Sequence, residues 1–184
     1  HRFKTVASGT ADATISWTTN MVIDINSRIS LSNNDGNTSN TIFGKNAWAG
    51  HPGDDDGSDY NTLFGEGVMG TGTIDTATYN VGIGFNALQD VTQADFNVAV
   101  GAQSCVQLTT GQNNVAIGTN ALNAATTQDE CVAIGRDALT ALNHDDADGS
   151  IGIGYLAGTA ITSGVGNVAI GYTALDACST SDYN

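Results

Sequence analysis

The chain has very few basic residues and no long apolar run, and these two absences narrow its possible functions. Five Lys and Arg residues stand against 19 Asp and Glu residues, giving a net charge of −14. The basic surface that would bind nucleic acid is missing, and phosphate groups or an anionic membrane would be repelled. No apolar run approaches the roughly 18 residues of a membrane-spanning helix. We therefore expect neither nucleic-acid binding nor membrane insertion.

Charged residues as a whole are also scarce, at 13% of the sequence, where ordinary soluble domains have about a quarter. The charge is unevenly placed, because residues 51–184 contain Arg136 as their only basic residue against sixteen acidic ones. Such a surface keeps an elongated β-protein soluble and discourages lateral aggregation.

Cysteine is limited to three residues, Cys105, Cys131 and Cys178, which occupy different positions in the repeat described below. Cys105 and Cys131 lie two repeats apart, or about 10 Å if successive coils stack at strand spacing. That separation is too large for a disulfide. We expect three free thiols that act as small apolar side chains.

The sequence does contain a repeat, in which a short apolar strand ends in glycine eight times, in steps of 17 to 21 residues: Gly44, Gly65, Gly84, Gly101, Gly118, Gly135, Gly154 and Gly171. A near-fixed period of this length is typical of solenoids, whose units bury apolar surface only against their neighbours. We predict an all-β, parallel β-roll or β-solenoid with about 17 residues per coil. It would span residues 39–184 and continue beyond residue 184.

Three columns of residues precede each glycine. The residue before the glycine is large and apolar, and the third residue before it is β-branched. Between them lies a residue that is Ala or Gly from the third repeat onward. The period of two places both large columns on one strand face and the small column on the other. In the opposite wall, the third and fourth residues after the glycine are predicted to point inward.

The small column suits close approach by another backbone. Two strands and two turns in 17 residues leave an interior of only three or four side chains per coil, a small core for an isolated rod. We therefore predict a homotrimer whose copies meet through the small column and the adjacent Asn column, the latter forming a hydrogen-bonded ladder: Gly82, Ala99, Ala116, Ala133, Gly152, Ala169, Asn80, Asn97, Asn114 and Asn167. The alternative is a single solenoid whose small face is hydrated.

Residues 1–38 do not fit the repeat. Alternating segments at 13–18, 21–25 and 28–32 predict short strands. We interpret this region as a β cap or connecting segment that covers the first coil.

The repeat resembles known fibre proteins. The string from Thr109 to Leu122, TTGQNNVAIGTNAL, resembles repeats of phage tail fibres, and residues 27–36, SRISLSNNDG, are similar to stretches in fibres of marine phages. The Asn-Val-Ala-Ile-Gly unit is also similar to one in the heads of trimeric autotransporter adhesins, which are left-handed parallel β-rolls. Ile42 and Leu63 depart from the small residue of that family, which implies a wider trimer axis there.

This resemblance implies a structural rod segment of a homotrimeric viral tail fibre, located in the virion and involved in host-surface attachment. Its partners would be two further copies of the chain and a glycan or protein receptor on the host. The alternative is that the chain belongs to the head of a bacterial trimeric adhesin at the cell surface.

Two groups of residues are candidate binding sites. Acidic loops contain Asp54, Asp56 and Asp59, and Asp146 and Asp148, which could hold Ca²⁺. A solvated protruding loop is the simpler interpretation, because neither loop matches a full calcium-loop pattern. A receptor glycan could stack on Trp48, Phe85, Tyr155 and Tyr172. A second aromatic column, Tyr60, Tyr79, Phe96 and Tyr183, is predicted to stack along the rod.

No catalytic constellation is evident, because the three His residues lie on unrelated loops and no nucleophile elbow is present. We predict that the protein is not an enzyme and needs no cofactor. Glycan cleavage by paired carboxylates remains the enzymatic alternative. An ice-binding solenoid would need a regular Thr-x-Thr array, which the sequence lacks.

Overall fold

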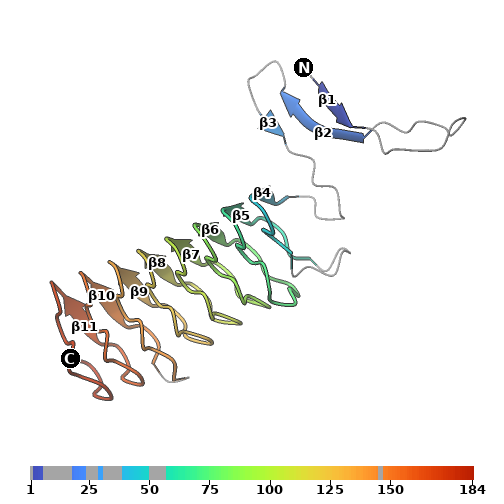
Figure 1. Cartoon of the computed structure of the whole chain (residues 1–184). Helices are drawn as coiled ribbons and strands as arrows, with labels where there is room; N and C mark the ends of the chain where they lie inside the picture. The colour runs from blue at the N-terminus through green and yellow to red at the C-terminus, as the bar shows by residue number, and fades with distance from the viewer. Residues whose placement is uncertain (1, 6–17, 24–28, 31–38, 50–56, 145–146) are drawn as a thin grey trace, which may run out of the picture. The chain divides into compact units, whose positions relative to one another are not determined.

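A computed structural model of the chain describes residues 2–5, 18–23, 29–30, 39–49, 57–144 and 147–184. The chain divides into two compact units, residues 1–35 and residues 36–184 (Figure 1). Within the described residues every regular element is a β-strand, so the all-β prediction is confirmed for this part of the chain. None of these residues belongs to a helix of the length and apolarity needed to cross a bilayer.

The first unit is a three-stranded antiparallel sheet in the order β1-β2-β3. Strand β1 is Arg2–Thr5, β2 is Thr18–Ile23 and β3 is Ile29–Ser30. The sequence pattern predicted the second and third of these strands but missed the first. The segment predicted at 13–18 lies almost entirely outside the described residues. The capping role of this unit stays a prediction.

The second unit is a parallel β-solenoid of about seven turns, with roughly 17 residues per coil. Its eight strands stack in chain order (Figure 1): β4 Thr41–Phe43, β5 Thr62–Phe64, β6 Val81–Ile83, β7 Val98–Val100, β8 Val115–Ile117, β9 Val132–Ile134, β10 Ile151–Ile153 and β11 Val168–Ile170. Equivalent residues pair without a register shift, as in Ala99 with Ala116 and Ala116 with Ala133. The repeat glycines therefore predicted the position of every strand in this unit.

Each strand ends at a glycine because the backbones of successive coils meet there. Gly118 has a φ of 133°, and a Cβ at this position would lie 2.5 Å from the carbonyl oxygen of Gly135 in the next coil. Only glycine combines this dihedral with this contact. The same geometry recurs at Gly101 and Gly135, so the glycine column sets the stacking of the coils.

In the described residues of the solenoid, the return path is built from left-handed corners rather than from a second strand. In the coil of Gly118, Asn113, Asn120 and Leu122 all have positive φ, at 59°, 57° and 50°. Such values are uncommon for residues other than glycine, and for a leucine they are exceptional. The prediction of two strands per coil was therefore wrong, because these turns, and not a second extended segment, use the remaining residues.

The interior of a coil holds more side chains than the three or four expected. In the coil of Gly118 five side chains are buried together with Gly111: Asn114, Ala116, Ala121, Leu122 and Ala125. The inward orientation predicted for the third and fourth residues after each glycine is confirmed by buried pairs such as Ala121 with Leu122 and Ala138 with Leu139. These columns merge into one continuous apolar core along the solenoid. The single chain thus has a substantial core of its own.

Candidate functional site: the outward face of the parallel sheet

The small column lies inside the coil, and the large columns lie outside. Ala99, Ala116 and Ala133 are fully buried within the single chain, and Ala169 is 1% exposed. Gly82 and Gly152 are buried with them. The prediction that these residues form a subunit interface is wrong, because the chain's own opposite wall already covers them.

The narrow interior explains this orientation. A Cβ added at Gly82 would come within 2.5 Å of Cγ1 of Val68, and one at Gly152 within 2.7 Å of Cγ of Leu139. Val68 and Leu139 belong to the opposite wall of the coil. A larger side chain in the small column would overlap this wall, since a packed interior has no spare volume.

The Asn column is also interior. Asn80 and Asn97 are fully buried, and Asn114 is 1% exposed, so these residues and the buried Asn167 are not at a subunit interface as predicted. The predicted ladder itself is confirmed. The Oδ1 atom of Asn97 accepts the backbone N–H and the Nδ2 group of Asn114, both at 3.0 Å. The Nδ2 group of Asn97 donates to Oδ1 of Asn80 and to the carbonyl of Gly111.

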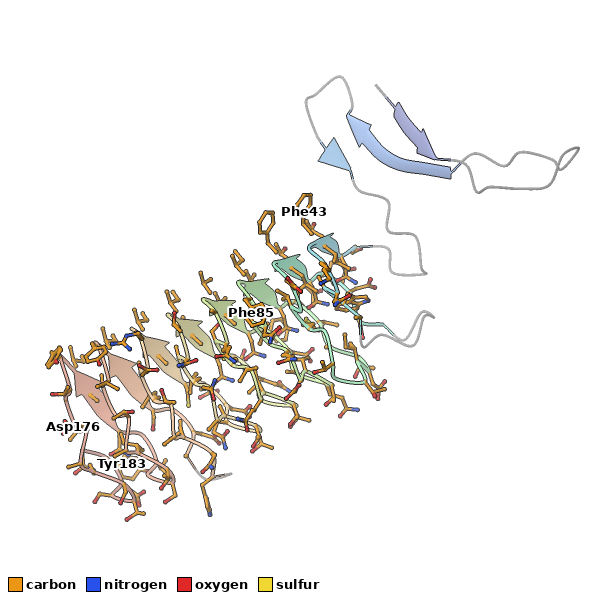
Figure 2. The ribbon with its side chains drawn as sticks, in the orientation of Figure 1. Phe43, Phe85, Asp176 and Tyr183 are labelled. Carbon is orange, nitrogen blue, oxygen red and sulfur yellow. The ribbon has the colours of Figure 1, made fainter. Side chains whose placement is uncertain are left out.

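The large columns instead form an outward apolar face, which we define as the first and third residues of β4–β11. Both columns contain only Thr, Val, Ile and Phe. Six of these residues have between 38% and 64% of their surface exposed: Phe43, Phe64, Ile83, Ile117, Val168 and Ile170. Figure 2 shows the ring of Phe43 projecting away from the ribbon. The face continues over all eight strands without a charged side chain.

The dimensions of the outward face follow from strand geometry. Seven intervals of about 4.8 Å make it about 34 Å long, and three residues at about 3.3 Å each make it roughly 10 Å wide. The projected area of about 340 Å² falls in the range at which exposed apolar patches on a monomer are often functional. Exposing apolar surface to water is unfavourable, so a partner that covered this face would stabilise the assembly through the hydrophobic effect.

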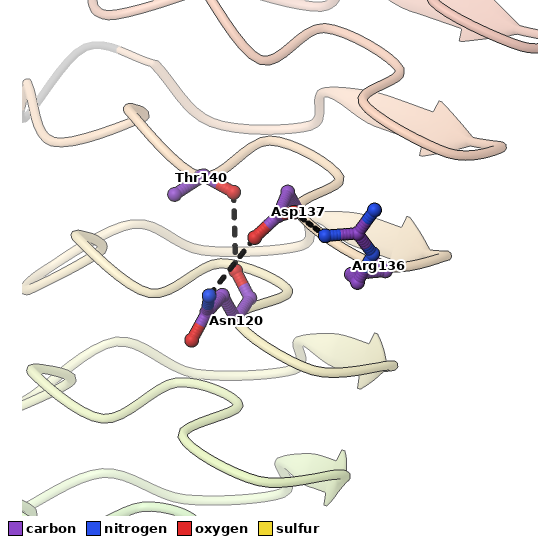
Figure 3. A network of polar contacts seen from close by, with 4 residues as sticks. All are labelled: Asn120, Arg136, Asp137 and Thr140. Carbon is purple, nitrogen blue, oxygen red and sulfur yellow. Dashed lines mark hydrogen bonds and ion pairs between the residues drawn. The ribbon is translucent and has the colours of Figure 1, made fainter.

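Charged residues lie next to the outward face in three coils, at the position after the glycine: Lys45, Glu66 and Arg136. Lys45 and Glu66 of successive coils form an exposed ion pair at 3.2 Å. Figure 3 shows a second group, in which Asp137 contacts Arg136 at 3.3 Å and accepts a hydrogen bond of 2.9 Å from Nδ2 of Asn120. The hydroxyl of Thr140 donates to the carbonyl of Asn120. Except for the Arg136–Asp137 pair, these contacts join residues of neighbouring coils.

The residues proposed to bind a receptor glycan are not equivalent. Trp48 is only 7% exposed and belongs to the core, so its assignment to a surface site is wrong. Phe85 and Tyr172 are 52% and 77% exposed. Tyr155 stacks on Tyr172 with ring centroids 5.2 Å apart, while Arg136 lies 4.4 Å from the Tyr155 centroid. Both faces of the Tyr155 ring are therefore occupied, and Tyr172 offers the better platform.

The second aromatic column stacks as predicted over its first three members. The ring centroids of Tyr60 and Tyr79 are 4.7 Å apart, and those of Tyr79 and Phe96 are 5.0 Å apart. Their interplanar angles are 12° and 4°. All three have positive φ, and about half of each residue, 48% to 53%, is exposed.

Only some of the residues that were predicted to bind metal lie among the described residues. Asp54, Asp56 and Asp146 lie outside the described residues. Asp148 uses its carboxylate to accept the backbone N–H of Asp129 at 2.8 Å. Among the residues that the structure describes, Asp59 included, no three His, Cys, Asp or Glu side chains come together as a metal site. Calcium binding stays a prediction.

The three cysteines are free thiols, as predicted. Cys105 and Cys131 are buried, whereas Cys178 is partly exposed. Burial raises the pKa of the Cys131 thiol to about 11, and burial likewise raises the pKa of Cys105. Both buried thiols are therefore neutral and unreactive at physiological pH.

Comparison with protein-family models, with curated proteins and with solved structures finds no match for this chain. The geometry of the solenoid therefore carries the functional argument.

Proposed function

We propose that this chain is a rod segment of a homotrimeric fibre of the viral tail-fibre type, which supports attachment to a host surface. The observation that carries this proposal is the outward apolar face, which is uncharged over all eight strands and has six side chains that are 38% to 64% exposed. A rod of this kind acts mechanically, as a stiff spacer about 34 Å long. Three copies also present three sets of exposed groups, so that weak contacts gain avidity.

A copy of the same chain is the partner that fits this face. The face repeats at every coil, so its partner needs an apolar surface with the same spacing along the whole length. Another copy has that spacing. Each chain has a net charge of −14, but none of that charge lies in the two outward columns, so copies can meet there without opposing like charges. Elsewhere the acidic surface limits further association.

The narrowness of the face favours three copies. Each strand has only two outward residues, and the chain turns away at the glycine directly after it. In a threefold ring, the first outward residue of one copy packs against the last outward residue of the next. Each narrow strip is then covered from both sides. A dimer of two flat sheets would need broader strands to bury a comparable area.

A charge placed on the outward face tests this proposal. Ile117→Asp puts a carboxylate in the middle of the face, and Gln107→Asp adds the same charge at an exposed position on the return path of the neighbouring coil. We expect Ile117→Asp to sediment as a monomer with an unchanged β-sheet circular dichroism spectrum, because each trimer would bury three carboxylates against apolar side chains of the neighbouring copies. Gln107→Asp should remain a trimer. A trimer that survives Ile117→Asp, or a wild-type monomer, would contradict the proposal.

A further inference from the structure

We propose that the copies associate in parallel and in register, and that the first two coils, together with Arg136 and Glu130, set this alignment. The inference rests on the proposed homotrimer and adds the direction and register of its chains. Most of the outward face cannot fix the register of the copies by itself, because it is nearly uniform. From β6 to β11 its two columns contain only Val and Ile, so a slip of one coil, about 4.8 Å, would replace each residue by a near equivalent. Repetitive strands specify register weakly.

The first two coils break this uniformity. Phe43 and Phe64 stack with their centroids 5.1 Å apart and an interplanar angle of 7°, and more than half of each residue is exposed. The other outward residue of the same strands is small, Thr41 in β4 and Thr62 in β5. A large ring is thus combined with a small neighbour, whereas later strands combine two side chains of middle size.

Such a combination is complementary only in one alignment. In a parallel, in-register ring each Phe of one copy lies beside the Thr at the same level in the next copy, and from β6 to β11 each Val or Ile lies beside another Val or Ile. A slip or a reversal of one copy would press a Phe ring against Val or Ile and leave a Thr opposite a gap. Overpacking and voids each destabilise an interface, so the aromatic end selects one register and one direction.

The residues on either side of β9 provide a second, independent signal. Glu130 is exposed and lies two residues before this strand, and Arg136 lies two residues after it. In a head-to-tail ring the end of each strand lies near the start of the same strand in the next copy. Arg136 would then meet Glu130 of its neighbour. Arg136 contacts Asp137 through one terminal nitrogen, which leaves further N–H donors for a second carboxylate.

The same positions in the last two coils are complementary in size. Tyr155 and Tyr172 follow β10 and β11, while Gly149 and Gly166 are the corresponding residues before these strands. A large ring in one copy therefore faces a glycine in the next when the chains are aligned. A shift of one coil toward the N-terminus would bring Tyr155 against Glu130.

Cysteine cross-linking in the full chain measures the register directly. In a Cys178→Ser background, chains that carry Ile117→Cys are refolded with mass-tagged chains that carry either Val115→Cys, in the same coil, or Val132→Cys, one coil away, and the mixtures are oxidised. We expect disulfides between positions of the same coil and at least tenfold fewer between unlike positions, that is, positions one coil apart. Cross-links between unlike positions at a similar level would show slippage, and their predominance would overturn the inference.

The role of the first two coils is tested by giving their outward positions the Val and Ile residues of the later coils. The variant Phe43→Ile, Phe64→Ile, Thr41→Val, Thr62→Val should remain trimeric and show at least a tenfold rise in cross-links between unlike positions. An unchanged cross-linking pattern in an intact trimer would overturn the role of the first two coils. A monomeric parent chain would instead refute the proposed function, so sedimentation of the same samples separates the two failures.

The charge signal is tested by reversal. Arg136→Glu should make the trimer dissociate at a several-fold higher chain concentration on dilution. Adding Glu130→Arg should restore the original value, because the ion pair is then re-formed with opposite polarity. A single and a double variant with equal dissociation would remove Arg136 and Glu130 from the mechanism.

Discussion

The inward and outward sides of the same three-residue strands differ in the size of the side chains that they carry. Inside, β8 places Ala116 in a fully buried position, while outside Ile117 is 39% exposed. In an ordinary domain the larger apolar residue would be the buried one. Here the distance between the two walls of the coil limits side-chain size, and the larger residues lie outside. The comparison shows that on strands β6–β11 size rather than hydrophobicity decides which residues are buried.

The largest effect is expected from breaking the buried Asn ladder. Asn97→Leu keeps the side-chain size but removes the acceptor of Asn114 and the donors to Asn80 and Gly111. Because the remaining groups are buried and lose their partners, we expect the free energy of unfolding to fall by about 3–5 kcal/mol. Chemical denaturation measures this loss. Gln107→Leu, at an exposed position, is the control and should change stability by less than about 0.5 kcal/mol.

Exchanging the two sides of one strand should have a slightly smaller effect. The double variant Ala116→Ile, Ile117→Ala preserves composition but moves the large residue into the narrow interior. Overpacking should cost about 3 kcal/mol, seen as a lower thermal midpoint. Ile117→Ala alone should leave the fold of the coil intact and weaken only self-association. Equal stability of the exchanged variant and the wild type would show that the sides are interchangeable.

Alkaline pH should distinguish the interior from the surface through the buried thiols. The folded-state pKa of Cys131 is about 11, above the value of 9.0 expected when it is unfolded. Its contribution to stability is therefore complete below pH 9 and is lost as the pH rises from 9 to about 11. Relative to Cys131→Ala, the wild type should lose roughly 2–3 kcal/mol over this range. Parallel stability curves for the two proteins would contradict the burial of the Cys131 thiol.

The smallest effect should come from the exposed aromatic stack. Tyr79 has a stacked ring on each side, at 4.7 Å and 5.0 Å, so Tyr79→Ala should cost about 1 kcal/mol. Tyr183 occupies the same repeat position in the last coil and is 79% exposed. Tyr183→Ala is the matched control and should have little effect on the thermal midpoint. Equal losses at both positions would show that stacking contributes nothing.

Much of the solenoid was predictable from the sequence, because the repeat glycines mark where backbones touch. The period of two also separated Ala116 from Val115 and Ile117 correctly. It could not tell which side faces inward, since alternation is symmetric and the width of the coil appears only when both walls are built. Trp48 could have been recognised as buried, because it shares its repeat position with Met69 and Leu122.

The left-handed corners were harder to foresee. Leu122 has a positive φ, a conformation that no propensity assigns to leucine, and it is held there by burial of its side chain. Such tertiary effects leave no local signal in the sequence. The candidate interface was missed for the same reason as the orientation of the strands.

The mass of the intact chain in solution tests the central claim most directly. If the outward apolar face is covered by copies of the chain, sedimentation equilibrium at micromolar concentration should give three times the monomer mass of 18.8 kDa. The value should stay constant over a tenfold dilution. A stable 18.8 kDa species that keeps its β-sheet spectrum would show that the face needs no partner and would contradict the account.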